Sequence, residues 1–345
     1  MEKDTSRFLA TLNSFGSRSQ ATVALVRLIE EDGAGDHSSF ARDMYNAAYC
    51  CVAVCRHAYR WGTIPVVKVA QAETMLGFPP ELDIPWAFFQ RHFGLSADSG
   101  NNTSNVLLNF DSSGHRVYQI NPGMSELIQS WEDVFFRMFL DVEVKAYPLY
   151  YHMVCAIVKF DAGDKKACLA HVRLVSEGLR ELLLTFYNNL RGNRVARSVW
   201  LSYIQGFQAW GIGRMVDGQF VRYDGLSGNH VLVFQAVDAF LGMERYLSDE
   251  DMDRYIPVNQ RDFALSLKKH TPRHRLRDTD AADVAIRDEM TAIVKRMKSY
   301  LEVPAPERLM MTAGKSVLES DEVQGFEEAY AKLDEQMGTR LKETK

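Results

Sequence analysis

Hydrophobic residues recur at steps of three and four along most of the chain, which is the spacing of an amphipathic helix. Alternation typical of a strand is confined to two short stretches, "RVYQI" at 116–120 and "QFVRY" at 219–223. The helical pattern predicts helices over 38–61, 124–160 with an interruption near Pro148, 164–190, 194–210, 230–247, 258–268 and 281–302. Together these patterns predict an all-α protein with short β ribbons.

The order of the segments divides the chain into three parts. We expect a smaller, mainly helical N-terminal domain and linker at 1–110 and a larger helical domain at 111–317 that carries the pocket. Residues 318–345 are charged and amphipathic, which is typical of an exposed helix or a docking arm. The polar run at 95–105 indicates a loop, and "WGIGRMVDG" at 210–218 indicates a turn.

Composition narrows the class of partner and the compartment. The formal net charge of -5 and the pI near 6.0 argue against a nucleic acid or an anionic membrane as the main partner. No apolar run approaches the roughly 20 residues of a membrane helix, and the charged first residues do not form a secretory signal. Five cysteines, an odd number, favour reduced thiols and a cytoplasmic protein, with Cys51 and Cys55 interpreted as buried thiols rather than zinc ligands.

The common catalytic motifs are absent from the sequence. It contains no GxSxG elbow, HExxH pair, phosphate loop or dinucleotide-binding fingerprint, and no spacing of its nine histidines predicts a metal site. His230 is the best single candidate, because it follows the glycine-spaced loop "YDGLSGN" at the expected start of a helix. We expect its pKa to stay close to the ordinary value and its ring to serve in proton transfer.

Two aromatic stripes are the other candidates for a binding site. Trp131, Phe135 and Phe139 recur every four residues on one expected helix. The other stripe has 3-4-3 spacing and consists of Trp200, Tyr203, Phe207 and Trp210. Such stripes are usually plain core, but they also make the apolar walls that a planar ligand requires, and both interpretations stay open.

Several stretches, in order and spacing, resemble the indoleamine 2,3-dioxygenases, heme enzymes related to tryptophan 2,3-dioxygenase. The resemblance runs from about residue 45 to 303. It is carried by "AYRWG" (58–62), "ELDIPWAFFQRHFGL" (81–95), "VFFRMFLDVEV" (134–144), "YDGLSGNHVLVFQAVDAFLG" (223–242), "RYIPVNQRDFALSL" (254–267) and "DVAIRDEMTAIVKRMKSYL" (283–301). It implies an all-α, indoleamine-dioxygenase-like fold, heme b as the cofactor and a small aromatic or indole-containing substrate.

The resemblance also implies roles for individual residues. Phe135 matches the aromatic residue beside the substrate ring, and Ser227 matches the loop serine that contacts ligand and heme edge, with Gly225 and Gly228 giving the loop freedom. Asp238 and Lys298 match an Asp–Arg pair beside a heme propionate. Asn102 and Asn105 fall where the family lines its innermost pocket with Tyr and Cys, so the resemblance implies a more polar pocket here.

The chain differs from the family at the positions of the iron ligand and of the substrate-binding arginine. Leu301 takes the place of the histidine that ligates the heme iron, and its neighbours are Tyr300 and Glu302. Ile204 takes the place of the arginine that binds the substrate carboxylate, and Phe139 narrows the distal space. Kynurenine-forming tryptophan dioxygenation is therefore not expected.

Three functions remain open on these residues. One is a divergent oxygenase-like enzyme for an aromatic substrate without a free carboxylate. Another is a heme-free relative that uses the pocket for acid–base catalysis, and the third is a protein that only binds an aromatic ligand or a partner. The residues expected to form the pocket are Phe135, Phe139, Trp200, Tyr203, Ser227 and His230.

Overall fold

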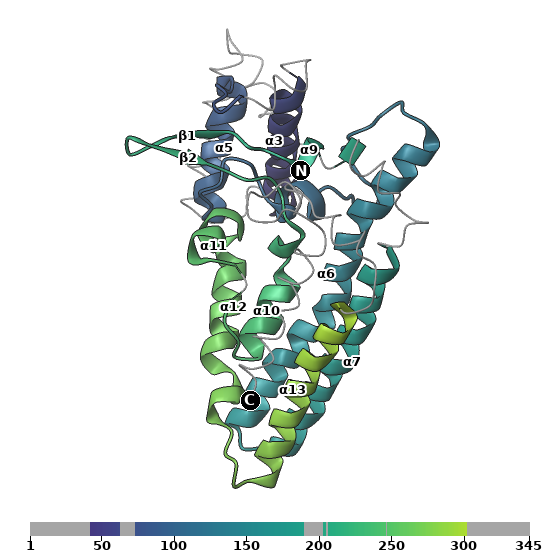
Figure 1. Ribbon diagram of the computed structural model, residues 1–345, viewed down its shortest axis with the longest axis vertical. Coiled ribbons are helices and arrows are strands. Elements are labelled where there is room, and N and C mark those ends of the chain that lie inside the picture. The colour runs from purple at the N-terminus through teal and green to yellow at the C-terminus, as the bar shows by residue number, and fades with distance from the viewer. Residues whose placement is uncertain (1–41, 63–72, 190–202, 205, 246, 302–345) are drawn as a thin grey trace, which may run out of the picture.

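The structure is a computed structural model that describes residues 42–62, 73–189, 203–204, 206–245 and 247–301. Within these residues the protein is mainly helical, as the hydrophobic pattern predicts (Figure 1). The longer helices form an elongated bundle, and a two-stranded hairpin projects near the end where α3 and α5 lie (Figure 1). None of the described helices is both long and apolar enough to span a bilayer.

Two long antiparallel helices organise the bundle. Helix α6 (Glu126–Asp161) begins at Ser125, whose side chain accepts a hydrogen bond from the backbone N–H of Ile128, and α7 (Lys165–Asn189) packs along it. Helix α13 (Ala281–Leu301) packs on α7, while α10 (Leu232–Phe240) and α12 (Val258–His270) pack on each other and on α6. Their apolar faces merge into the largest hydrophobic core.

Helices α3 (Arg42–Gly62) and α5 (Pro80–Phe93) form a smaller aromatic core at the other end. Tyr49 lies between the rings of Trp86 and Phe93, with centroids 5.6 and 4.3 Å away. A third cluster around Trp210 and Tyr255 lies beside the hairpin of β1 (Gly213–Val216) and β2 (Gln219–Arg222). The boundary predicted near residue 110 stays a prediction.

Helix α6 is not interrupted at Pro148, which corrects the sequence prediction. The helix runs through this residue to Asp161. Proline removes one backbone donor, so the carbonyl of Val144, four residues earlier, loses its helical partner. Val144 and Pro148 are both exposed, and water can satisfy that carbonyl.

The strand predicted at 116–120 is absent from the described structure, apart from one bridge between Phe110 and Arg116. Two of its backbone donors bind side chains instead: the N–H of Tyr118 donates to Oδ1 of Asn109, and the N–H of Ile120 donates to Glu132. These backbone N–H groups need no neighbouring strand, because the polar side chains accept their hydrogen bonds. The prediction at 219–223 is confirmed by β2, paired antiparallel with β1.

Two glycine- or asparagine-rich stretches predicted as turn and loop are more ordered than expected. Residues 213–216 of the predicted turn form β1. The predicted loop at 95–105 ends in a short π-helix, η1 (Thr103–Leu107), most of which is buried against α3 and α6. A π-helical turn is rare and occurs often at functional sites.

The remaining short elements complete the fold around the bundle. They are α9 (Gly206–Gln208), η3 (Gly228–His230), α11 (Asp249–Tyr255) and η4 (Pro272–Arg275). Most of the helix predicted at 194–210 lies outside the described residues, and its described end contains only α9 and a π turn at 203–204. The helix predicted at 230–247 is shorter, since α10 ends at Phe240 and Gly242 adopts a φ of 70°.

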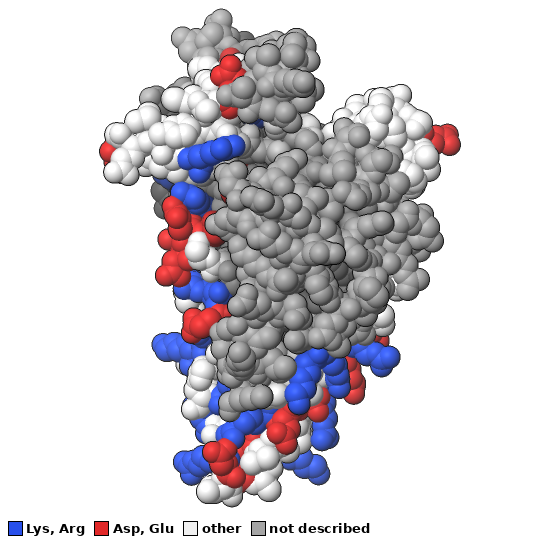
Figure 2. Space-filling model, viewed as in Figure 1, with Lys and Arg blue, Asp and Glu red and all other residues white. Residues whose placement is uncertain are grey.

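The surface carries charges of both signs. Figure 2 shows Lys and Arg interspersed with Asp and Glu along the side formed by α11 and α12, without a continuous basic area on that face. All five cysteines have free thiols. Cys55 is exposed and Cys51 is half-buried, so the expectation that both are buried is wrong: this part of α3 faces away from both cores.

Candidate functional site

An aromatic wall on α6 forms one side of the candidate site. The rings of Phe135 and Phe139 meet edge to face, with centroids 5.4 Å apart, because residues four apart share a helix face. Both are at most 3% exposed and belong to the same core cluster as Ile204 and Leu226. Residues from α6, the 203–204 turn and the glycine loop thus contribute to one hydrophobic core cluster.

The glycine loop lies against this wall. A Cβ placed on Gly228 would lie 3.1 Å from Cε1 of Phe139, so the loop backbone and the ring are in contact. At Gly225 a Cβ would lie 2.1 Å from the carbonyl oxygen of Gln208, a distance that no side chain tolerates. The N–H of Leu226 donates to the same carbonyl, which fixes the loop against residues 208–209. Gly225 thus serves close packing of the backbone rather than the loop freedom that the resemblance implies.

Ser227 and His230 interact within one turn. The backbone N–H of Ser227 donates to Nδ1 of His230 over 3.4 Å, and the backbone N–H of His230 donates to the carbonyl of Ser227. Since Nδ1 accepts, the proton of a neutral ring resides on Nε2. His230 is 4% exposed, and burial lowers its pKa to about 3. The expectation of a nearly ordinary pKa is therefore wrong, because desolvation disfavours the imidazolium form.

Tyr255 holds His230 from the other side, a contact that the sequence did not indicate. The two rings are stacked with centroids 4.6 Å apart and planes 12° from parallel. The hydroxyl of Tyr255 accepts a hydrogen bond from the backbone N–H of Asp224, and its carbonyl accepts one from Nδ2 of Asn101. Tyr255 thereby links the glycine loop to the segment before η1.

That segment is anchored to α3 by two buried side chains. Arg56 is 1% exposed and pairs with Asp98 at 2.7 Å, while Phe78 lies 3.8 Å from its guanidinium carbon. The two ring nitrogens of His57 lie 2.7 Å from the carbonyl oxygens of Ser99 and Phe207. His57 therefore has a structural role. The contacts of Arg56 with Asp98 and of His57 with Ser99 therefore fix the backbone at 98–101 next to η1.

Asn102 is the least satisfied polar side chain near the site. It is fully buried, and neither its amide oxygen nor its amide nitrogen has a hydrogen-bond partner among the described residues. Oδ1 of Asn105 accepts from Ser104, but its Nδ2 is also without a partner in the described part of the chain. Val106, on the same turn, belongs to the core cluster of Phe135 and Phe139. Buried amides without partners are costly, so this turn is where a polar ligand group would gain most.

Other predicted site residues are not brought into this arrangement. Tyr203 is 37% exposed, and its carbonyl accepts a hydrogen bond from Asn121, so the second aromatic stripe is not continuous. Trp200 lies outside the described residues. Asp238 is buried on α10, but the side chain of Lys298 is not described, so their pairing stays a prediction.

The described part of α13, where the resemblance places the iron ligand, does not fit a histidine-ligated heme. Leu301 ends α13 and carries no lone pair, and the described part of that helix contains no histidine or cysteine. No group of three or more metal-binding side chains occurs within the described residues. The contact of Phe139 with Gly228 also fills the space between α6 and the loop with a phenyl ring. Heme b therefore remains only an implication of the sequence resemblance.

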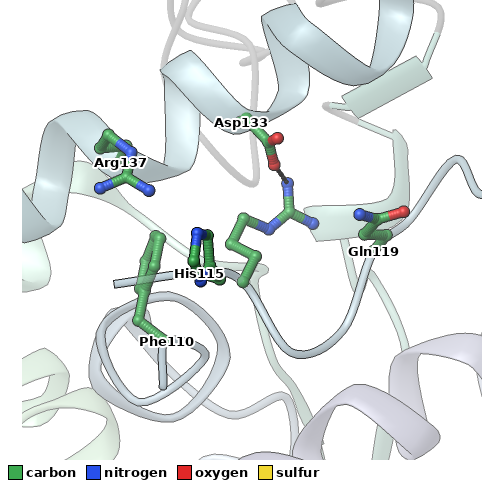
Figure 3. A pocket seen from close by; sticks show the side chains of 6 residues that line it. Phe110, His115, Gln119, Asp133 and Arg137 are labelled. Atoms are coloured by element: carbon green, nitrogen blue, oxygen red, sulfur yellow. Dashed lines mark hydrogen bonds and ion pairs between the residues drawn. The ribbon is translucent and has the colours of Figure 1, made fainter. Parts of the chain in front are cut away.

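A small hollow of about 130 Å³ lies elsewhere on the surface, and the sequence did not indicate it. In Figure 3 its lining comes from the segment before α6 and from α6 itself, namely Phe110, His115, Arg116, Gln119, Asp133 and Arg137. The guanidinium of Arg116 is already bound by Glu132 and Asp133, which neutralises its charge. This hollow is therefore a weaker candidate for an anion site than its two arginines suggest.

Comparisons with known proteins do not assign the chain to a family. No protein-family model and no curated protein matches the chain. The fold and site define a mainly helical protein in which the 225–230 loop contacts Phe139 and η1 packs against α6.

Proposed function

We propose that the protein is a divergent indoleamine-dioxygenase-like enzyme that acts on a neutral, planar aromatic molecule of the indole class. The observation that carries the proposal is the fully buried amide of Asn102, which has no partner among the described residues, directly before η1, which packs against α6, the helix that carries Phe135 and Phe139. An aromatic ring with a polar N–H or carbonyl would satisfy both features, since ring surface suits the wall and the polar group suits the amide.

The absence of a carboxylate from the substrate follows from Ile204. This side chain is fully buried within the core cluster and offers no charge or hydrogen bond. A buried carboxylate without a cationic partner would lose on the order of 2–5 kcal/mol of binding free energy. Free tryptophan is thus a poor ligand in this proposal, and kynurenine formation is not proposed.

His230 acts in the proposed site as a hydrogen-bond donor rather than a base. Its Nδ1 lone pair is taken by the N–H of Ser227, and its pKa of about 3 keeps it neutral at physiological pH. Nε2–H remains to orient a polar substituent of the ligand. Oxygenase-type chemistry would require a heme, whose axial ligand would have to come from a residue other than Leu301.

Ligand binding tests the proposal. Isothermal titration calorimetry should show indole binding at least about tenfold more tightly than tryptophan, because only tryptophan carries the carboxylate. Asn102→Leu should weaken the binding of indole or oxindole by about tenfold, as the amide is lost at nearly constant volume. Asn259→Leu, which removes an exposed amide on α12 outside the site, is the control. Equal binding of tryptophan and indole, or full affinity in Asn102→Leu, would contradict the proposal.

A protein that only binds its aromatic ligand is the second candidate, favoured by the low pKa of His230. Incubation of the protein with a bound indole under air, with and without added hemin, separates the two functions. Mass spectrometry should detect an oxygenated product if the protein is an enzyme of the proposed class. Quantitative recovery of unchanged ligand, together with no Soret band after hemin addition, would establish the binding function instead.

A further inference from the structure

Two histidines meet where helices α6 and α7 pack together. Nδ1 of His152 on α6 lies 3.1 Å from Nδ1 of His171 on α7, with ring centroids 5.3 Å apart and planes inclined by 33°. We call these two residues the histidine pair. They are 19 positions apart in the sequence, so no local spacing of histidines indicated the contact.

The helix packing around the pair is tight. Helices α6 and α7 lie side by side (Figure 1). Close to His152 on α6, the side chains of Leu149, Met153 and Ala156 are at most 2% exposed. A Cβ placed on Gly178 of α7 would lie 2.6 Å from Cδ1 of Leu149, so the two backbones approach closely there. The separation of the two imidazoles is therefore set by packed helices rather than by a loop.

The distance between the two nitrogens suits two ligands of one metal ion. Imidazole nitrogens bind Zn²⁺ at about 2.0–2.1 Å, which places two ligands of a tetrahedral site about 3.3 Å apart. At the right angle of a tetragonal Cu²⁺ or Ni²⁺ site, bonds of about that length place two ligands about 2.9 Å apart. The 3.1 Å between Nδ1 of His152 and Nδ1 of His171 lies between these two values.

Without a metal the contact is a hydrogen bond, in which one Nδ1 donates and the other accepts. To bind an ion, both neutral rings carry their proton on Nε2, and each turns so that its Nδ1 lone pair points at the ion. This change releases no net proton, because each neutral imidazole keeps one. Both side chains are half-buried, so solvent reaches the pair and water can complete the coordination.

The ligand type selects the class of ion. Imidazole suits zinc, copper and nickel, whereas Mg²⁺ and Ca²⁺ prefer oxygen ligands. No group of three or more metal-binding side chains occurs in the described ranges, so the pair supplies two ligands and water the others. Residues 318–345, the predicted exposed helix or docking arm, lie outside the described residues and contain no histidine or cysteine. With half the protein ligands of a structural zinc site, we expect a Kd on the order of micromolar.

We propose that His152 and His171 form a binding site for a divalent transition-metal ion of the zinc and copper class, with both Nδ1 atoms as ligands. The bound ion joins α6 to α7 and stabilises the folded protein, because the unfolded chain does not hold the two rings together. His152 lies 13 residues, or about 20 Å of helix axis, from Phe139. The metal site is therefore independent of the function proposed for the ligand site.

Isothermal titration calorimetry of the full-length protein with Zn²⁺ tests the site. The wild type should bind Zn²⁺ with a Kd on the order of micromolar. His152→Ala and His171→Ala should each weaken this binding at least about tenfold, since one of two protein ligands is lost. His115→Ala, which removes a side chain that is 78% exposed, is the control and should bind Zn²⁺ like the wild type. His152→Gln keeps a polar side chain of similar size and gives the same test if His152→Ala does not fold.

Carbethoxylation of histidines by diethyl pyrocarbonate, read by mass spectrometry, locates the ion in the wild type. An imidazole with a metal on Nδ1 and a proton on Nε2 has no lone pair left to react. Zn²⁺ should therefore slow the modification of His152 and His171 at least about tenfold and leave His115 unchanged, and Mg²⁺ should protect none of them. Zn²⁺ binding that survives His152→Ala/His171→Ala at full affinity would overturn the proposal. So would equal modification of His152 and His171 with and without Zn²⁺.

Discussion

The imidazole of His230 lies flat against the phenol ring of Tyr255, with ring centroids 4.6 Å apart and planes 12° from parallel. Residues 25 positions apart in the sequence thus form one buried unit, which joins the 225–230 loop to Asn101 through the backbone carbonyl of Tyr255. Tyr255 covers one face of the imidazole, while the backbone N–H of Ser227 occupies its Nδ1. The contact also shields the imidazole from water, so desolvation sets the protonation state of His230.

Stability should depend on pH through His230. In the unfolded chain the imidazole takes up a proton near its ordinary pKa of 6.5, whereas in the folded protein it does so only near 3. Folding therefore becomes less favourable as the pH falls from 6.5 towards 3, by up to about 1.4 kcal/mol per pH unit for this proton. Urea unfolding of wild type and His230→Phe between pH 7 and pH 4, within that window, measures the effect.

The His230→Phe variant should show the smaller slope of unfolding free energy against pH. His115→Phe replaces a histidine whose side chain is 78% exposed and should keep the wild-type slope. Parallel curves for wild type and His230→Phe would show that the imidazole of His230 is protonated equally in both states.

The amide of Asn102 should favour ligand binding but lower the stability of the ligand-free protein. Because both polar atoms of its buried amide have no partner among the described residues, Asn102→Leu should raise the unfolding free energy of the ligand-free protein by about 1–3 kcal/mol. Asn101→Leu is the matched comparison, since Asn101 donates to Tyr255 and accepts from Ser104, and it should lower stability by a similar amount. Thermal and urea unfolding measure both, and destabilisation by Asn102→Leu would show that its amide already has partners.

The two loop glycines should respond differently to the same substitution. Gly225→Ala places a methyl group 2.1 Å from a backbone carbonyl oxygen, which cannot move without displacing residues 208–209. We expect a loss of at least about 3 kcal/mol of stability, or failure to fold. Gly228→Ala meets the edge of the Phe139 ring at 3.1 Å, which a small ring movement relieves, and should cost about 1 kcal/mol. Circular dichroism melts compare the two, and equal losses would contradict the assigned contacts.

Removing the carboxylate should destabilise the protein far more in the buried pair of Arg56 and Asp98 than in a surface ion pair. Asp98→Ala leaves the 1%-exposed guanidinium of Arg56 with only a partly exposed partner, Asp83, and should cost about 3–5 kcal/mol. Asp161→Ala breaks an ion pair with Arg275 in which both side chains are more than 40% exposed, and should cost no more than about 1 kcal/mol. Denaturant unfolding at matched salt concentrations distinguishes them, and similar costs would contradict the role given to Arg56.

Helical content was predictable because apolar side chains at three- and four-residue steps share one face only if the segment is a helix. The boundaries of α7, α12 and α13 agree with the prediction within two residues. Helix α5 and helix α11 were not predicted: α5 contains Pro85, and α11 is only seven residues long. The strand predicted at 116–120 was wrong because the side chains of Asn109 and Glu132, 9 and 12 residues away from the donors they bind, accept hydrogen bonds from its backbone.

The candidate site was predictable only in its apolar part. Phe135 and Phe139 share a face by spacing alone, and the glycine loop was evident from its composition. Tyr255, Asn101 and Arg56 could not be assigned roles, because each acts through a contact with a residue at least 25 positions away in the sequence. Spacing along one helix carries no information on such contacts.

The sequence alone determined the helical class, the aromatic face of α6 and the absence of histidine from residues 281–301, since each follows from residue types and local period. Only the tertiary structure decided that His230 is neutral and held by Tyr255, and that the amide of Asn102 is buried without a described partner. The reason is physical. Desolvation and hydrogen-bond satisfaction depend on what surrounds a side chain in space, and the chain order does not record it.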